Sequence, residues 1–109
     1  MRERVVSKAQ SRPRRTIKLG SPALAVVEVQ DVAEEMRARG YRAKRNEDLD
    51  GAYLPSDETI LVRQGLSRRA RAATILHELL HACGLDDEKT TLQIEIALTP
   101  VLLRQGWSP

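Results

Sequence analysis

The stretch "TILHELLHACGLDDEKT", residues 74–90, determines how the whole chain is interpreted. It contains the only two histidines of the protein, His77 and His81, and Glu78 directly follows the first of them. Residues four apart project from the same face of an α-helix, about one turn from each other. Two imidazole nitrogens can then reach one metal ion, at the distance of about 2.0–2.1 Å that zinc requires. The spacing therefore predicts a metal site on a helix.

The residues around the histidines favour a mostly buried helix. Ser67 is a typical N-cap residue and Gly84 a typical terminator, so we predict a helix over residues 68–83. Imidazoles that are buried without a metal or a hydrogen-bond partner are costly. The apolar neighbours of the histidines are Leu76, Leu79 and Leu80. We therefore expect the histidines to bind a metal ion rather than to be solvated polar groups of a surface helix.

Glu78 stands where a general base is needed. It follows His77 by about 100° of helical rotation, which sets its carboxylate beside the metal rather than on it. Zinc lowers the pKa of a bound water towards about 7, and a nearby carboxylate can take the proton as that water attacks a carbonyl. We therefore predict hydrolysis, with Zn²⁺ as the cofactor, His77 and His81 as ligands and Glu78 as the base.

A catalytic zinc site takes a third protein ligand, and the sequence offers four carboxylates for it. Glu95 stands among apolar residues of the following segment, where burial of a charge is expensive unless it meets a cation. Asp87 comes after a glycine that could turn the chain back towards the metal. Asp86 and Glu88 have an ordinary explanation as caps and dipole partners in the first turn of a helix. We expect Glu95 to be the ligand and Asp87 to be a cap, with Asp87 as the alternative ligand.

Composition and charge limit the class of protein. The 109 residues suffice for one domain, and 41% apolar with 30% charged residues is typical of a soluble globular chain. Residues 1–15 hold six basic side chains against one acid, which predicts a flexible basic arm that is a candidate contact for nucleic acid. Residues 16–109 are expected to form the single domain. One cysteine fits a reducing cytoplasm, and no apolar run reaches the roughly 18 residues of a membrane span.

The segment that precedes the strands is predicted to be a helix. Ser21 is a suitable N-cap, Pro22 suits the first helical position, and Gly40 is expected to end the helix. The β-branched run "AVVEV" inside this segment is also typical of a strand.

Further along the chain, strand and helix signals alternate. The pair Asp50-Gly51 marks a turn, and "AYL" and "TILVR" read as two strands joined by a turn that starts with a proline. A last helix should begin near Glu88, and Pro100 should kink or end it. The prediction is an α+β fold with an N-terminal helix, a small mainly antiparallel sheet, the histidine helix and a C-terminal supporting helix.

The string "TILHELLHACGL", with a glutamate on a downstream helix, resembles the HExxH zinc peptidases of the gluzincin type. It is especially similar to small phage-borne and mobile-element versions related to ImmA/IrrE proteins, over about residues 52–107. The resemblance rests on His77, Glu78 and His81, and it implies a zincin-like fold that hydrolyses a protein or peptide substrate. It also implies that the strand over residues 59–63 is an edge along which an extended substrate pairs.

Two other families share part of the string. The metzincin pattern HExxHxxGxxD would make Asp87 the ligand, but both methionines, Met1 and Met36, lie upstream of the motif, where they cannot form a downstream methionine turn. The bacterial rRNA-maturation zinc hydrolases resemble HxxLHxxGxDH, with Asp87 in place of the last histidine and Glu78 where a glycine is usual. Under that interpretation the basic arm would contact RNA phosphates. The presence of Glu78 favours a peptidase, and a non-catalytic phage structural or regulatory domain is a further alternative.

Overall fold

The computed structural model describes residues 24–44 and 47–109. Its elements follow one another as β1 (Ala25–Val29), α1 (Val32–Ala38), β2 (Gly51–Leu54), a short 3₁₀ helix (Pro55–Asp57), β3 (Thr59–Arg63), α2 (Arg68–Ala82) and α3 (Glu88–Arg104). The fold is α+β, as the sequence predicts. The basic arm predicted for residues 1–15 and the cap predicted at Ser21 and Pro22 lie outside the described residues.

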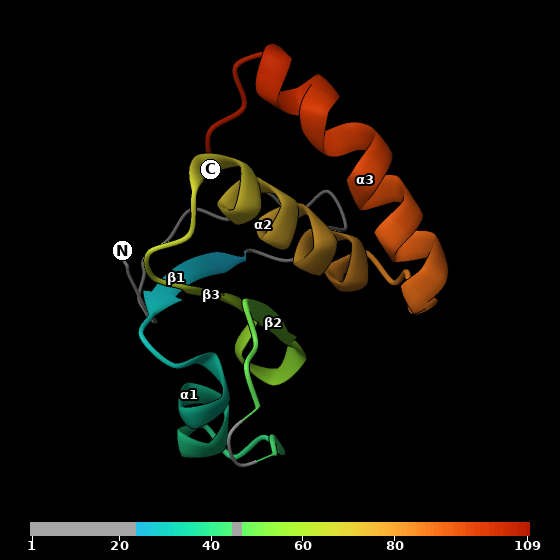
Figure 1. Ribbon diagram of the computed structural model, residues 1–109. Coiled ribbons are helices and arrows are strands. Elements are labelled where there is room, and N and C mark those ends of the chain that lie inside the picture. The colour runs from blue at the N-terminus through green and yellow to red at the C-terminus, as the bar shows by residue number, and fades with distance from the viewer. Residues whose placement is uncertain (1–23, 45–46) are drawn as a thin grey trace.

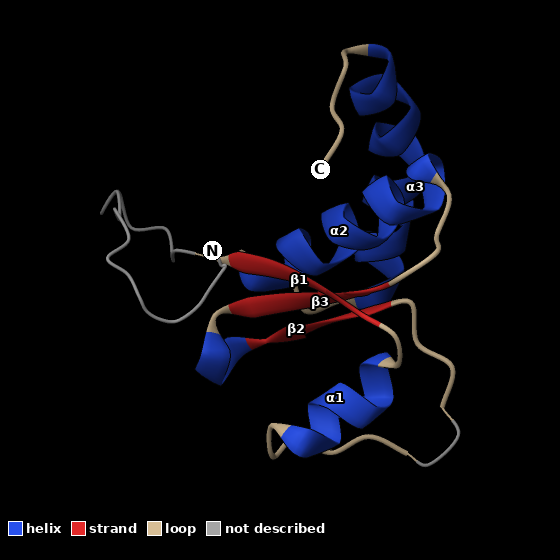
Figure 2. Cartoon of the chain, turned by 90° about the vertical axis from the view of Figure 1, so that its left-hand side faces the viewer, coloured by secondary structure: helices blue, strands red, loops and turns tan. Residues whose placement is uncertain are grey.

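A three-stranded sheet lies between the helices, with the strand order β1-β3-β2. β1 runs parallel to β3, and β2 runs antiparallel to it, so the sheet is mixed rather than mainly antiparallel. Figure 1 shows α1 on one side of the sheet and α2 and α3 on the other. Figure 2, turned by 90°, shows the same layers with α1 below the strands. The histidine helix α2 is therefore supported by the sheet on one side and by α3 on the other.

The prediction of one helix between Ser21 and Gly40 is wrong for its first half. Residues Ala25–Val29 form β1, and only Val32–Ala38 are helical. β-branched residues fit a pleated surface, and pairing with β3 stabilises the strand more than the apolar pattern favours a helix. The side chain of Asp31 accepts a hydrogen bond from the amide of Glu34 at 3.0 Å and so sets the helix start. Gly40, with a φ of 89°, follows the helix as predicted.

β3 is the central strand, so the expectation that it forms a substrate-binding edge is wrong. Leu61 lies opposite Val27 of β1 on one side and opposite Ala52 of β2 on the other. Four of the five β3 residues are buried, which explains the continuous apolar run in this strand. The outer strands of the sheet are β1 and β2.

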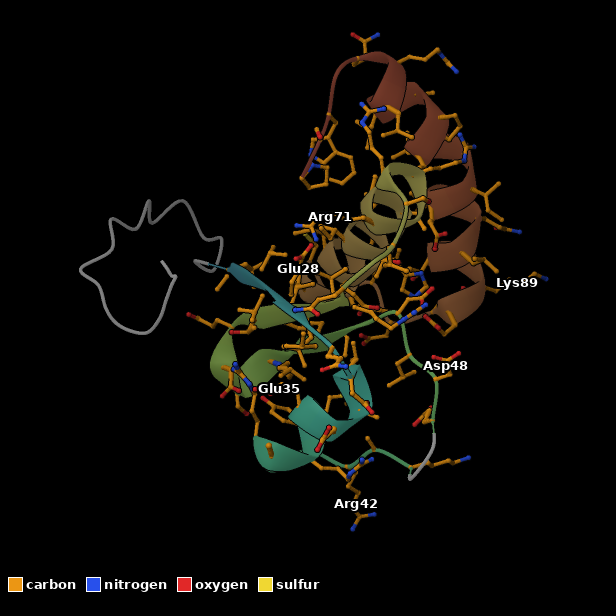
Figure 3. All side chains as sticks on the ribbon, turned by 60° about the vertical axis from the view of Figure 1, so that its left-hand side comes forward. Glu28, Glu35, Arg42, Asp48, Arg71 and Lys89 are labelled. Carbon is orange, nitrogen blue, oxygen red and sulfur yellow. The ribbon has the colours of Figure 1, made fainter. Side chains whose placement is uncertain are left out.

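The two faces of the sheet carry different groups. A buried cluster on the α1 side consists of Val32, Ala52, Leu54 and Leu61. Alternate residues of a strand point to opposite faces, and Glu28 of β1 forms an ion pair with Arg71 of α2 on the other side. Figure 3 shows these two side chains pointing towards each other. Arg71 also donates to the backbone carbonyl of Pro109 at 2.8 Å, so one side chain connects β1, α2 and the end of the chain.

Both long helices start at the predicted caps. Ser67 accepts a hydrogen bond from the amide of Ala70 at 3.1 Å, and Asp87 accepts one from the amide of Thr90 at 3.1 Å. α3 continues through Pro100 to Arg104, so the helix does not end at this proline, which was one of the two outcomes predicted there. None of the helices in the described part of the chain is long and apolar enough to cross a membrane.

Candidate metal centre

A tight reversal brings the start of α3 against the last turns of α2. Gly84 has a φ of 100°, and its amide donates to the carbonyl of His81 at 2.9 Å. The amide of Leu85 donates to the carbonyl of Leu80 at 3.0 Å. This pair of hydrogen bonds is the Schellman motif, which satisfies the last carbonyls of a helix and turns the chain sharply. α3 can therefore place acidic side chains beside the two histidines.

His77, His81 and Glu88 converge on one point. The Nε2 atom of His77 lies 3.0 Å from Oε1 of Glu88, and Nε2 of His81 lies 2.7 Å from the same oxygen. The two imidazole rings lie edge to face, with centroids 4.9 Å apart. One ligand atom from each of the three residues lies within 4.8 Å of the others. In a tetrahedral site with bonds of about 2.0–2.1 Å, ligand atoms would be about 3.3 Å apart, so little movement separates this cluster from such a site.

The second nitrogen of each imidazole has an acceptor of its own. Nδ1 of His77 lies 2.9 Å from Oε1 of Glu95, and Nδ1 of His81 lies 2.7 Å from the carbonyl oxygen of Leu85. A carbonyl oxygen and an ionised carboxylate only accept hydrogen bonds, so both Nδ1 atoms carry the proton. In the neutral imidazoles both Nε2 atoms then present lone pairs to the point where the Glu88 oxygen lies.

This donor set fits a divalent cation. Two imidazole lone pairs and a carboxylate oxygen at 2.7–3.0 Å repel one another unless a proton or a cation lies between them. Imidazole and carboxylate are common zinc ligands, and the hydrogen bonds of the Nδ1 atoms are the outer contacts that orient zinc-binding histidines. Without a metal, at least one of the two imidazoles must be protonated to face the Glu88 carboxylate. This contact raises the pKa of His81 and lowers that of Glu88.

Two pKa values reflect the close contact within the cluster. Burial lowers the pKa of His81, but its hydrogen bonds with the Leu85 carbonyl and the Glu88 carboxylate raise it more, so the pKa stands above its ordinary value. Burial raises the pKa of Glu88, but the hydrogen bond with His81 and the charge of His77 lower it by more than burial raises it. The pKa of Glu88 therefore stands below its ordinary value. Both shifts favour a cation facing a carboxylate.

Glu78 lies against the edge strand β2. Burial raises the pKa of its carboxyl group, while the nearby histidines and a hydrogen bond from the backbone amide of Tyr53 lower it less. β2 approaches α2 closely at this place because its first residue is Gly51. A methyl group at Gly51 would lie 2.4 Å from Cγ2 of Thr74 and 3.6 Å from Cγ of Glu78. The glycine thus lets β2 lie close to α2 at Thr74, and the Glu78 side chain lies beside this contact.

The other predicted site residues take distinct places. Glu95 lies beside the first histidine, but it contacts Nδ1, the nitrogen that faces away from Glu88. Asp87 is a helix cap, as predicted, and the Thr90 hydroxyl and amide lower the pKa of its carboxyl group. Cys83, directly after α2, is exposed.

Sequence reasoning passed over Glu88 and the Leu85 carbonyl. An acid in the first turn of a helix has an ordinary role as a dipole partner, so Glu88 carries no signal that separates it from Asp86 or Asp87. A backbone carbonyl carries no sequence signal for a ligand-orienting contact. The tight Gly84 reversal was the available clue, because it brings residues soon after it back towards His81.

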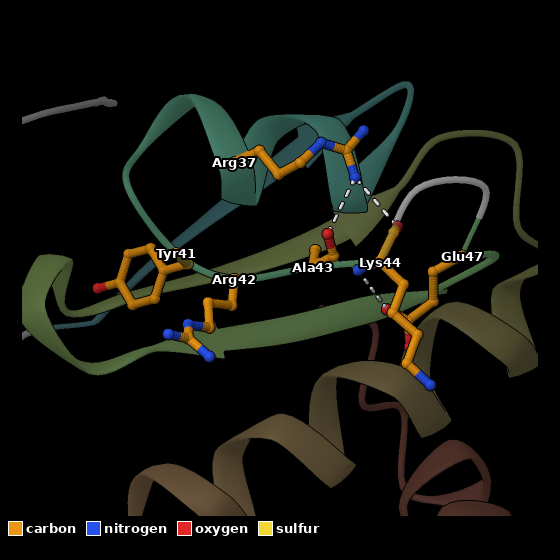
Figure 4. Close-up of a pocket in the computed structure, with 6 residues that line it drawn as sticks. All are labelled: Arg37, Tyr41, Arg42, Ala43, Lys44 and Glu47. Atoms are coloured by element: carbon orange, nitrogen blue, oxygen red, sulfur yellow. Dashed lines mark hydrogen bonds between the residues drawn. The ribbon is translucent and has the colours of Figure 1, made fainter.

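A hollow lies beside α1, lined by residues of this helix and of the segment that follows it (Figure 4). Arg37 donates to the backbone carbonyls of Ala43 at 3.4 Å and Lys44 at 3.0 Å, and the Lys44 amide donates to Glu47 at 3.2 Å. The lining residues are Arg37, Tyr41, Arg42, Ala43, Lys44 and Glu47. These contacts fix the backbone of Ala43 and Lys44. The side chains of Arg37 and Glu47 therefore have a structural role in this hollow.

No protein-family model matches the chain, and searches of the curated proteins and of the solved structures found no match to it.

Proposed function

We propose that the protein is a zinc-dependent peptidase whose active site lies at the junction of α2 and α3. One observation carries the proposal: both histidine Nε2 atoms face a single carboxylate oxygen, while both Nδ1 atoms are held by other acceptors. This arrangement orients two imidazoles as metal ligands in advance, and such preorganisation reduces the cost of binding. His77, His81 and one glutamate would hold the ion.

The geometry favours Glu88 over Glu95 as the third ligand. Glu88 shares the point at which the two Nε2 atoms meet, and its side chain is 72% exposed, so water can reach the same point. Glu95 is 21% exposed and lies at Nδ1 of His77, where it fixes the tautomer and the ring orientation. The alternative third ligand is Glu95, which the sequence favours because its neighbours along the chain are apolar.

Glu78 supplies the acid–base chemistry in this proposal. A bound zinc ion would activate water and polarise a substrate carbonyl. Glu78 takes up a proton from the attacking water as a general base. The same carboxyl group then donates this proton to the leaving amine as a general acid. Its partial burial against β2 raises the tendency of its carboxyl group to hold a proton.

The position of Glu78 supports a peptide as substrate. The Arg63 amide donates to the Asp50 carbonyl at 2.8 Å, so Asp50 and every second residue after it direct their backbone groups towards β3. The residues between them, including Tyr53, direct their backbone amide and carbonyl groups away from β3. The Tyr53 amide that bonds with Glu78 therefore belongs to the outer edge of β2. A peptide added to this edge by main-chain hydrogen bonds would pass directly by the Glu78 carboxylate.

Zinc content and cleavage together test the proposal. Purified protein supplemented with zinc should hold about one equivalent by elemental analysis, and His77→Ala or His81→Ala should abolish it. Glu78→Gln should keep the zinc and lose cleavage of fluorescein-labelled casein, because the residue is a base and not a ligand. Less than about a tenth of an equivalent in the unaltered protein would contradict the metal site. Zinc binding with casein cleavage that survives Glu78→Gln would contradict the role of the base.

A further inference from the structure

The chain that returns from α1 to β2, here called the returning chain (residues 41–44 and 47–50), is attached to both ends of β2. The hydroxyl of Tyr41 accepts a hydrogen bond at 3.0 Å from the amide of Ser56, in the 3₁₀ helix that follows β2. Leu49 stands just before β2, and both Tyr41 and Leu49 pack against the buried cluster on the α1 side of the sheet. The returning chain therefore runs along the α1 side of β2, from the end of this strand back to its start.

Two basic side chains project from the returning chain. Arg42 and Lys44 are exposed, whereas Tyr41 and Ala43 are half-buried. This alternation is typical of an extended chain with one face towards a core. Arg37 donates to the carbonyls of Ala43 at 3.4 Å and Lys44 at 3.0 Å, so the backbone that carries the two cations is held in place. Figure 4 shows Arg42 and Lys44 extending away from Arg37 and α1, towards the side on which α2 lies.

Neither Arg42 nor Lys44 forms a salt bridge with a described residue. The carboxylate of Glu47 accepts a hydrogen bond from the Lys44 amide at 3.2 Å. Other arginines of the described chain do form salt bridges with acidic side chains, namely Arg39, Arg63 and Arg71. Two cations on a fixed backbone can therefore accept a carboxylate from a partner, and such charge-assisted hydrogen bonds are among the stronger ones.

The two cations border the outer edge of β2, along which a peptide would pass Glu78. Alternate residues of β2 belong to the buried cluster on the α1 side, while Gly51 between them faces α2. Side chains of a peptide strand added to this edge would alternate between the same two faces. Those on the α2 face would approach Glu78, and those on the α1 face would approach Arg42 and Lys44.

We propose that Arg42 and Lys44 select peptide substrates that carry two acidic residues separated by one residue. This inference rests on the proposed peptidase function, because it names the substrate class of the same site. Residues two apart are about 6.6 Å apart in any extended chain, so two such carboxylates match the spacing of the two cations. The planar guanidinium of Arg42 can bind a carboxylate through two hydrogen bonds, and Lys44 binds one as a point charge.

Cleavage of matched peptides tests the preference. Three fluorogenic peptide libraries share their random positions and differ only in a fixed pair, which is Glu-x-Glu, Gln-x-Gln or Lys-x-Lys. The zinc-loaded protein should cleave the Glu library about 10-fold faster than the Lys library, with the Gln library between them. The advantage of the Glu library should shrink at about 0.5 M salt, because exposed charges are then screened. Equal cleavage of the three libraries would overturn the inference and leave the peptidase proposal intact.

Charge reversal tests whether these two residues cause the preference. Arg42→Glu combined with Lys44→Glu should make the Lys library the better substrate. Arg68→Glu combined with Arg69→Glu is the matched control, because it makes the same change of net charge at two exposed positions in the first turn of α2. This control should keep the preference for the Glu library. Circular dichroism and zinc content check that both variants are folded and loaded. A preference that survives reversal at 42 and 44, or that the control reverses equally, would overturn the inference.

A binding measurement separates this inference from the peptidase activity. Zinc-loaded Glu78→Gln should bind a fluorescein-labelled, alanine-based Glu-x-Glu peptide about 10-fold more tightly than its Lys-x-Lys counterpart, as measured by anisotropy. That result in a protein that cleaves nothing would reject the peptidase proposal alone. Equal binding of the two peptides, or binding of neither, would overturn the inference. Displacement of the Glu peptide by single-stranded DNA at a lower concentration than by unlabelled peptide would assign the two cations to phosphate groups and would overturn it as well.

Discussion

At the scale of single residues, the candidate site depends on which nitrogen of each histidine is held. The Leu85 carbonyl holds Nδ1 of His81, and the Glu95 carboxylate holds Nδ1 of His77. These contacts lie outside the point where the Nε2 atoms meet Glu88. The two glutamates therefore act at opposite edges of the same ring, and their removal should have different consequences.

Zinc affinity should separate these two roles. Glu88→Gln should weaken zinc binding more than 100-fold, because it removes a charged ligand, whereas Glu95→Gln should cost about 10- to 100-fold as an orienting contact. Competition with a chromophoric chelator measures both. Asp87→Asn is the control and should change the affinity little, since Asp87 caps α3. A larger loss in Glu95→Gln would return the ligand role to Glu95, and the largest loss in Asp87→Asn would favour the RNA-hydrolase alternative.

At the scale of elements, the close contact between β2 and α2 determines where Glu78 lies. Gly51 permits it, because a side-chain methyl there would lie 2.9 Å from the Leu61 carbonyl and 2.4 Å from Cγ2 of Thr74. The Leu61 carbonyl belongs to the central strand and cannot move without disturbing the sheet. A larger residue must therefore push α2, or β2, outward.

Gly51→Ala should impair both stability and cleavage. We expect a loss of about 1–3 kcal/mol in the free energy of unfolding from overpacking, and a fall in kcat for casein as Glu78 moves off the edge of β2. Urea denaturation and cleavage assays measure the two effects. Thr74→Ser removes the methyl group that clashes, so Gly51→Ala combined with Thr74→Ser should recover part of each. Unchanged kcat in Gly51→Ala would show that this contact does not position Glu78.

At the scale of the whole molecule, a metal ion at the candidate site would add a further connection between α2 and α3, which also meet through the hydrogen bond between His77 and Glu95, through side-chain packing and through a short reversal. His77 and His81 belong to α2, and Glu88 belongs to α3. A ligand that binds the folded state alone stabilises it by mass action. The metal would therefore be part of the stability of the fold as well as of its chemistry.

Thermal unfolding should depend on zinc. Zinc at about 1,000 times its dissociation constant should add about 4 kcal/mol to the free energy of unfolding, and a chelator should remove this gain. Differential scanning calorimetry with and without zinc measures the change in Tm. His81→Ala should have a Tm that does not respond to zinc. An equal response in the unaltered protein and in His81→Ala would place the stabilising ion elsewhere.

Local signals in the sequence were sufficient for much of the fold and for part of the site. Ser67, Asp87 and Gly84 act within one turn of the helices that they start or end, so their effect does not depend on distant residues. The strands β2 and β3 and their proline-started connection follow from composition and turn chemistry in the same way. The shared helical face of His77 and His81 follows from their spacing on one rigid element.

The tertiary structure decided what depends on contacts between elements. The run "AVVEV" became a strand because β3 offered it a pairing partner, which no local pattern shows. β3 became central rather than an edge once β1 took its second side. The angle between α2 and α3 after Gly84 determined that Glu88 meets the Nε2 atoms while Glu95 meets Nδ1. Spacing along a helix defines a face, but the angle between two helices determines which atoms on facing surfaces come within 3 Å, and that angle follows from packing.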